Sequence, residues 1–193
     1  MKNEALDWRW FGWMHPVTPL LVWLPVSIGA IMWGATAWQL TNSELALFAT
    51  AALVSWSLLE YTLHRFLFHP PCKSKMLCRW AQAIHGKHHG DPNHLTFALV
   101  SPVNAAVILL PLAGIISLLV PLRGLTVFIG FFLLGYLSYE YLHLAIHHQK
   151  PRTRLGKFLA RHHLSHHAQN DEGNFGVTSH LWDWLLGTWR RGS

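Results

Sequence analysis

The sequence predicts an all-α integral membrane protein, with four transmembrane helices in two hairpins and a histidine-rich cytosolic cap. Three observations support this fold class. The 193-residue chain is 51% hydrophobic and 12% charged, which is about half the charged fraction of a typical soluble domain. Four apolar segments are long enough to cross a bilayer as helices, which takes about 20 residues each. Twelve of the fifteen histidines fall in four short clusters near the same ends of these segments.

Residues 1–16, before the first predicted span, alternate tryptophan with polar residues. Tryptophan favours the interface between membrane and water, so we expect this segment to form a short anchor in the plane of the membrane. An ordinary belt of aromatic residues beside a transmembrane helix would produce the same pattern.

Very short connections, at residues 41–43 and 121–124, separate the first span from the second and the third from the fourth. They predict two helical hairpins. Residues 64–96 and 147–193 carry all the clustered histidines except His143, which lies near the end of the fourth span, and they are predicted to form the cap. The whole chain is thus expected to be a single membrane domain. The predicted spans cover residues 17–40, 44–63, 97–120 and 122–146.

The lysines and arginines predict how the chain is oriented. Fourteen of the fifteen lie in the N-terminal segment, the long loop and the tail, and only Arg123 lies on the opposite side. Positive residues concentrate on the cytosolic side of membranes, so both termini and the cap are predicted to be cytosolic. The net charge of +6 is spread beside apolar spans, which is typical of contact with anionic lipid headgroups rather than nucleic acid.

The clustered histidines have spacings that a helix can bring to one face. Residues three or four apart share a helical face, which describes most of each cluster. His64 and His69 are five apart, so they converge only if the helix ends or bends near Phe68, before Pro70 and Pro71. The sequence therefore predicts ten metal ligands: His64, His69, His85, His88, His89, His143, His147, His163, His166 and His167.

Ten converging imidazoles indicate a centre of two metals. Imidazole is the commonest protein ligand for transition metals, and an all-nitrogen ligand set suits iron or zinc rather than magnesium or calcium. A single histidine in an apolar helix is more often a hydrogen-bonded core residue, so the prediction depends on four clusters meeting at one membrane face. The roles of His148 and His162 stay open between supporting and surface positions. His15, His94 and His180 are expected to be structural or interfacial.

Acidic residues lie close to the clusters. Glu60 and Glu140 each precede a clustered histidine by about one helical turn. A buried acid near the end of a membrane span is costly, so we expect both glutamates to hydrogen-bond histidine ligands rather than face lipid. Asp91 and Asp183 are further candidate partners for ring N–H groups.

The combined spacing His-x4-His, His-x2-His-His, His-x3-His-His and His-x2-His-His resembles the fatty acid hydroxylase superfamily, which includes sterol oxidases and desaturases. The segments from Glu60 to His69 and from Phe175 to Thr188 are most similar to fatty acid 2-hydroxylases. The similarity covers roughly residues 55–190. It implies an integral membrane oxygenase whose histidines hold two metal ions, iron in the active enzyme, with zinc as an alternative occupant.

The resemblance also implies catalytic residues and an activity. Tyr139 and Glu140 match an aromatic–acidic pair that lies near substrate or ligands, with glutamate where the family usually has aspartate. The implied reaction is hydroxylation at C2 of a fatty acid or of a sphingolipid N-acyl chain, with O₂ and external electrons. About sixteen residues precede the first span, so we expect no haem domain there. The electrons would come from a separate cytochrome b5-like protein, ferredoxin or reductase.

Other functions share these features. The same centre supports desaturation, sterol oxidation or carotenoid ring hydroxylation, and the sequence leaves these reactions open. A zinc transporter or metal-storage protein would also use histidines, but transporters place ionisable ligands near the bilayer midplane rather than at helix ends. A zinc hydrolase would need fewer ligands than two all-histidine metals provide. The substrate headgroup, the chain length and the oligomeric state are not specified by the sequence.

Overall fold

The computed structural model describes residues 15–70, 74–95, 97–168 and 173–190, and these residues form helices and connecting loops without any β-strand. The predicted interfacial anchor at residues 1–16 lies almost entirely outside the described residues. The four long helices are α2 (Thr18–Ala37), α3 (Asn42–Thr62), α6 (Pro102–Leu119) and α7 (Leu122–His148).

All four long helices are apolar enough to cross a membrane, as the sequence predicts. Their bounds follow the predicted spans within a few residues, with one larger difference. The third span is predicted from residue 97, but α6 begins at Pro102. The Ser101 hydroxyl accepts a hydrogen bond from the N–H of Asn104, and proline occupies the first helical position. Both features favour a helix start at this point.

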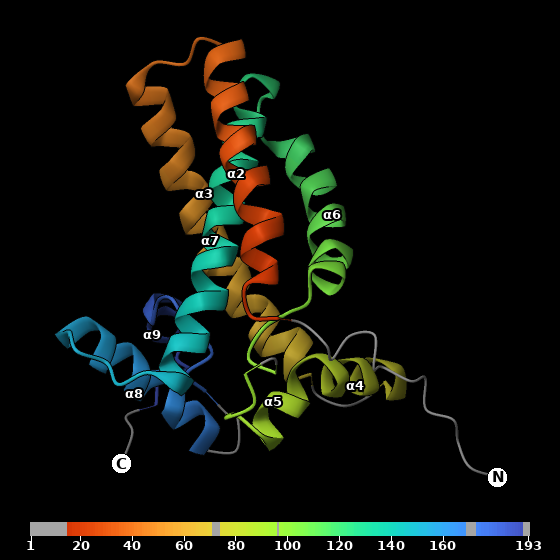
Figure 1. Cartoon of the computed structure of the whole chain (residues 1–193), viewed down its shortest axis with the longest axis vertical. Helices are drawn as coiled ribbons and strands as arrows, with labels where there is room; N and C mark the ends of the chain where they lie inside the picture. Colours follow the sequence, from red (N-terminus) through yellow and green to blue (C-terminus); the bar gives the residue numbers. More distant parts are fainter. Residues whose placement is uncertain (1–14, 71–73, 96, 169–172, 191–193) are drawn as a thin grey trace.

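Helix α7 lies at the centre of the bundle, with α2 and α3 packed along it and α6 beside it (Figure 1). Glycines permit the close approach of α7 to its neighbours: a Cβ atom at Gly135 would lie 2.6 Å from Cγ of Trp56. The Trp56 indole makes edge contacts with the rings of Phe132 and Tyr136, at centroid distances of 5.3 and 5.6 Å. These contacts fix α3 against α7 just above the histidines.

The hairpin turns meet at the end of the bundle opposite the histidines. Thr41 and Glu44 form a capping box at the start of α3, and Arg123 at the start of α7 donates to the Glu44 carboxylate at 2.9 Å. This ion pair joins the two hairpins on the side where the sequence predicts a single positive residue.

Helix α3 widens at its other end into a π-helix, η1 (Leu63–Phe68). The N–H of His69 donates to the carbonyl of His64 at 3.1 Å, which is the i to i+5 pairing of a π-helix. This pairing places residues five apart one above the other. The prediction that the helix ends near Phe68 is confirmed, because η1 ends at that residue. The sequence did not predict the wider helical turn, which brings His64 and His69 to the same face.

Short helices form the cap at one end of the bundle (Figure 1). The loop between the hairpins contains α4 (Lys75–Ala81), a second π-helix η2 (Gln82–Gly86) and α5 (Lys87–Gly90). The tail contains α8 (Arg154–Ala168) and α9 (Leu181–Leu185). The four clusters are thus carried by η1, by η2 with α5, by the end of α7 and by α8.

Candidate metal centre

The structure brings all ten predicted ligand candidates together, and it divides them into two groups of five. Within each group the five ligand nitrogens lie within 4.8 Å of one another. The first histidine group is His64, His69, His85, His89 and His166. The second histidine group is His88, His143, His147, His163 and His167.

Two clusters divide between the groups. His85 and His89 belong to the first group, whereas His88, between them in sequence, belongs to the second. On α8 the reverse holds, because His166 joins the first group and its neighbours at 163 and 167 join the second. Successive residues on a helix point about 100° apart, so adjacent histidines such as His88 and His89 diverge toward different groups. The expectation that each cluster points in one direction is wrong.

The spacing of the ring nitrogens fits metal coordination. Six pairs of Nε2 atoms face each other at 3.0–3.1 Å, three in each group. Two nitrogens bound about 2.1 Å from one metal and at a right angle lie about 3.0 Å apart. No carboxylate belongs to either group of described residues. The donor set therefore fits two transition-metal ions with nitrogen ligands.

Backbone carbonyls fix the orientation of three of these rings. Nδ1–H of His64 donates to the carbonyl of Phe175 at 2.5 Å, and Nδ1–H of His143 donates to that of Ala98 at 2.9 Å. Nδ1–H of His166 donates to the Gly173 carbonyl at 2.7 Å. A carbonyl only accepts, so the proton lies on Nδ1 and the lone pair of Nε2 is free to bind a metal.

Burial keeps the cap histidines in the form that binds metal. The pKa values of His85, His88 and His163 lie well below the usual range. Desolvation is the larger cause, and repulsion from the neighbouring imidazoles is the smaller one. The same causes lower the pKa of His167 to about 2. These side chains are neutral near pH 7, and neutral imidazole is the ligand form.

Two buried carboxylates hold the chain segment 173–178 that supplies carbonyls to the first group. Glu60 on α3 accepts from the N–H groups of Val177 and Thr178, at 2.6 and 2.8 Å, and from the Thr178 hydroxyl. Asp183 accepts from the N–H groups of Phe175 and Gly176, at 2.9 and 2.8 Å. Desolvation would raise the pKa of Asp183, but its hydrogen bonds together lower it.

The glutamates differ from expectation in their partners. Glu60 and Glu140 are buried and do not face lipid, as predicted, but among the described residues both bond to backbone N–H groups rather than to histidines. Glu140 accepts from the N–H of Val100 at 2.8 Å. A carboxylate can accept several backbone N–H bonds. The loop backbone is buried at Val177 and partly buried at Val100, so its N–H groups need partners.

The remaining candidates lie outside both groups. His162 points to Asp183, with Nε2 and Oδ2 3.1 Å apart. His148, at the end of α7, has a buried Nε2 with no hydrogen-bond partner among the described residues. The ring of His180 contacts that of Phe158 at a centroid distance of 4.7 Å. Asp91 is exposed at the end of α5 and belongs to neither histidine group.

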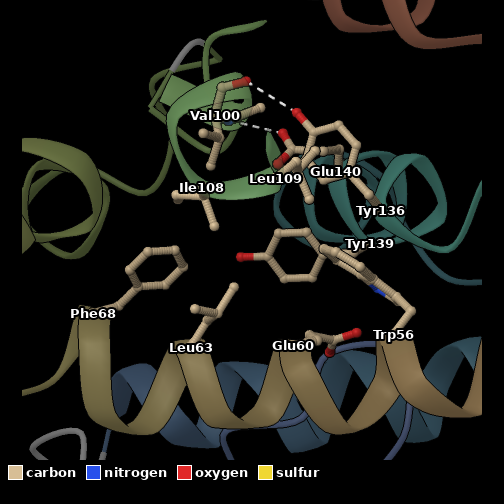
Figure 2. Close-up of a pocket in the computed structure, with 11 residues that line it drawn as sticks. Trp56, Glu60, Leu63, Phe68, Val100, Ile108, Leu109, Tyr136, Tyr139 and Glu140 are labelled. Atoms are coloured by element: carbon tan, nitrogen blue, oxygen red, sulfur yellow. Dashed lines mark hydrogen bonds between the residues drawn. The ribbon is translucent and has the colours of Figure 1, made fainter. Parts of the chain in front are cut away.

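An apolar pocket lies between α3, η1, α6 and α7 (Figure 2), and two of the residues that line it contact histidine rings. The cavity is narrow, with a volume of about 30 Å³. The Tyr139 ring stacks on His143 at 5.6 Å, and the Phe68 ring stacks on His85 at 5.1 Å. The pocket is lined by Trp56, Glu60, Leu63, Phe68, Val100, Ala105, Ile108, Leu109, Tyr136, Tyr139 and Glu140.

Both predicted catalytic residues border this pocket. Figure 2 shows the Tyr139 hydroxyl pointing into the space between Phe68, Leu63 and Ile108. Glu140 uses Oε2 to hold Val100, while its Oε1 is buried without a hydrogen-bond partner among the described residues. The polar atoms near the histidines are therefore few and specifically placed in an otherwise apolar pocket.

Comparison with known proteins identifies the family to which these features belong. The fatty acid hydroxylase family model matches residues 49–188. Dihydroceramide fatty acyl 2-hydroxylase FAH2 of Arabidopsis thaliana is 35% identical over 86% of this chain and 70% of the relative. Human fatty acid 2-hydroxylase is 36% identical, over 69% of this chain and 37% of the relative.

A solved structure shares the fold. The hydroxylase domain of full-length Scs7p has a TM-score of 0.84 and 27% identity, covering 93% of this chain and 68% of that chain. The ceramide very long chain fatty acid hydroxylase SCS7 of Saccharomyces cerevisiae is 33% identical over 92% of this chain and 45% of the relative. Together with the two histidine groups and the four membrane helices, these matches show that the chain belongs to the fatty acid hydroxylase family.

Proposed function

We propose that this chain hydroxylates C2 of a lipid acyl chain, in a free fatty acid or in the N-acyl chain of a ceramide-type sphingolipid. The reaction uses O₂ and two electrons from an external donor. The observation that carries the proposal is the pair of five-histidine groups beside an apolar pocket. The names of the relatives, which are acyl 2-hydroxylases, supply the substrate class.

The ten histidines would hold two metal ions, one in each group. Iron bound there would supply the activation of O₂ and the removal of an acyl hydrogen. Zinc can occupy the same nitrogen ligands, so the metal found in isolated protein depends on supply as well as on the site. The chain contributes neutral imidazoles, whose orientation the carbonyls of Phe175, Gly173 and Ala98 fix.

The pocket would bind the first part of the acyl chain and its carbonyl group. Apolar walls exclude water from the hydrocarbon, and the Tyr139 hydroxyl donates a hydrogen bond to the acyl carbonyl. Because C2 is bonded to the carbonyl carbon, a hydrogen bond that holds the carbonyl group in place also holds C2 in place. Tyr139 stacks on His143 of the second group, so C2 is held beside the histidines. Glu140 borders the same space through Oε1 and completes the polar end of the pocket.

The orientation of the chain follows from its charges. The cap, with its lysines and arginines, faces the cytosol, and the turn that carries Arg123 faces the opposite side. The electron donor is a cytochrome b5-like protein, a ferredoxin or a reductase that reaches the cap from the cytosol. Basic residues on the cap would steer an acidic donor to it.

Metal analysis of two variants tests the centre. His166 belongs to the first group and His88 to the second. Purified wild-type protein is expected to hold two iron ions per chain, whereas His88→Ala and His166→Ala each lose metal and produce no 2-hydroxy lipid while still inserting into the membrane. The control is His94→Ala, because His94 lies outside both groups. Full metal content and full activity in either of the first two variants would refute the site.

A further inference from the structure

Glu60 and Glu140 hold two separate loops in the same manner. Glu60 accepts from the N–H of Val177, and the carbonyl two residues earlier, at Phe175, accepts from Nδ1–H of His64. Glu140 accepts from the N–H of Val100, and the carbonyl two residues earlier, at Ala98, accepts from Nδ1–H of His143.

In each case the glutamate and the histidine lie about one turn apart on the same helix. Glu60 and His64 are on α3 and its continuation η1, and Glu140 and His143 are on α7. The helix therefore fixes the loop through its carboxylate, and the loop fixes the helix's own histidine through a carbonyl. All four side chains are buried, with exposed fractions of 0–3%.

We infer that Glu60 and Glu140 are paired positioning residues, one for each metal site. His64 belongs to the first histidine group and His143 to the second, so each group contains one ring held in this way. The inference rests on the proposed two-metal function and adds that the affinity of each site is set separately, by a different glutamate. Residues that orient a metal-binding histidine typically change metal affinity by about 10- to 100-fold when removed.

Glutamine should preserve this arrangement at Glu60. Both backbone N–H groups bond to Oε1, which an amide oxygen can replace, and the third contact is with the Thr178 hydroxyl. That hydroxyl can accept from an amide NH₂ as well as donate to a carboxylate. Alanine removes all three contacts. The pair Glu60→Gln and Glu60→Ala therefore separates loss of positioning from loss of charge.

Stepwise metal titration of the purified protein tests the inference. Stripped protein is loaded with Co²⁺, whose absorption spectrum reports each site, and His85→Ala identifies the signal of the first group. Glu60→Ala is expected to weaken the first site by about 10- to 100-fold and to leave the second unchanged, whereas Glu140→Ala does the reverse. Glu60→Gln is expected to bind both ions within a few-fold of wild type.

The matched control is Glu44→Ala, which removes the capping box at the opposite end of α3. It destabilises the same helix without touching the loop at 175–178. Equal weakening of both sites by Glu60→Ala, or the same loss in Glu44→Ala, would overturn the inference, as would unchanged affinities in both alanine variants. If wild-type protein binds no second ion, the proposed two-metal function fails instead.

A second inference concerns α9 and the residues that directly follow it, 186–189, whose outward face is apolar. Trp184, Leu185, Leu186 and Trp189 are 61%, 54%, 52% and 39% exposed, and the acidic residue of the helix, Asp183, points inward and is buried. A run of exposed apolar residues of this kind marks a contact surface. Tryptophan at two of its positions is typical of the membrane interface.

The position of α9 along α3 places this face at the level of the bilayer. The indole N–H of Trp182 donates to the Ser57 hydroxyl at 3.0 Å, and Ser57 lies within the apolar span Asn42–Phe68. At about 1.5 Å per residue, Glu44 and Arg65 are about 31 Å apart along this helix, which matches a hydrocarbon thickness of about 30 Å. Ser57 is about 12 Å inside Arg65 on the same scale.

We propose that α9 is seated in the lipid of the leaflet next to the cap. The lipid-facing side of α3 continues onto it, since Val54 and Leu58 beside Ser57 are also exposed. Bilayer lipid thus covers Trp184 and its neighbours and supports the tail segment that Asp183 holds against the first histidine group.

Photo-crosslinking in lipid nanodiscs tests this seating. Trp184 and Leu185 are each replaced by p-benzoylphenylalanine, with Val54 as the lipid-facing reference and Arg161, which is exposed on α8, as the aqueous reference. Both α9 positions are expected to form phospholipid adducts like position 54. Adduct levels equal to those at position 161, or crosslinks to a second copy of the chain, would overturn the proposal.

Discussion

The Nε2 atom of His162 lies 3.1 Å from a carboxylate oxygen of Asp183, and both side chains are buried. The adjacent His163 points the other way, into the second histidine group. Consecutive histidines on α8 therefore have different partners. His162 joins α8 to the start of α9, and His163 faces the proposed metal.

This difference predicts opposite results for neighbouring variants. His163→Ala should lose the metal of the second group, because it removes one of five nitrogens. His162→Gln should keep two metals per chain, since its amide nitrogen can take the place of Nε2 and donate to Asp183. Metal content by mass spectrometry of the purified proteins makes the comparison. Loss of a metal from the glutamine variant, with retention in His163→Ala, would show that His162 rather than His163 is the metal ligand of the fourth cluster.

Asp183 is predicted to be a major contributor to the stability of the tail. It accepts from His162, from the backbone N–H groups of Phe175 and Gly176, and from the Thr188 hydroxyl at 2.7 Å. Asp183→Ala leaves these buried donors unsatisfied, at a cost of about 1–3 kcal/mol each before relaxation. We expect a fall of several degrees in the melting temperature of the detergent-solubilised protein. The exposed acid Asp91 provides the control, and an equal fall in Asp91→Ala would contradict this assignment.

Tyr139→Phe is predicted to reduce hydroxylation without changing metal content. The substitution keeps the ring that stacks on His143 and removes the hydroxyl that points into the pocket. Loss of one hydrogen bond of about 1.4 kcal/mol lowers kcat/KM about tenfold. Tyr136→Phe is the control, because the Tyr136 hydroxyl already donates to the Val100 carbonyl at 3.3 Å. This variant removes a tyrosine hydroxyl from the same pocket but keeps the group proposed to bind the acyl carbonyl. Unchanged turnover in Tyr139→Phe would exclude a role for its hydroxyl in binding the acyl carbonyl.

The pocket itself is tested by filling it. Ala105 on α6 is 2% exposed and lines the pocket, whereas Val107 on the same helix is 62% exposed toward lipid. Ala105→Phe should occupy much of the space that the acyl chain needs, and turnover should fall while both metals are retained. Val107→Phe adds the same ring to the outer surface and should have little effect. Similar activities in the two variants would place the substrate elsewhere.

The sequence predicts the architecture well because membrane spans and ligand clusters depend on local composition. The length of the apolar segments predicts the four helices, and the distribution of lysine and arginine predicts at which helix ends the cap lies. The ten histidines at helical spacing are the ten that the structure brings together. The sequence indicates two metals but does not predict which histidine joins which group, because membership depends on the rotation between adjacent residues such as His88 and His89, and on how the cap helices meet.

The supporting contacts could not be predicted, because they join distant parts of the chain. Glu60 bonds to Val177, 117 residues later, and Glu140 bonds to Val100, 40 residues earlier. Nothing local in the sequence indicates either loop partner. The π-helix at η1 is compatible with the spacing of His64 and His69, since its i to i+5 pairing brings residues five apart to the same face, but the spacing alone does not predict it.

The central claim is that oxygen is inserted at C2 of an acyl chain, and an isotope measurement tests it directly. Iron-loaded protein is supplied with an electron donor, O₂ and a ceramide whose N-acyl chain carries two deuterium atoms at C2. Mass spectrometry of the released acid is expected to show one added oxygen and loss of one of the two deuterium atoms. A product that gains oxygen and keeps both deuterium atoms would place the reaction at another carbon, and loss of two hydrogens without added oxygen would make the enzyme a desaturase.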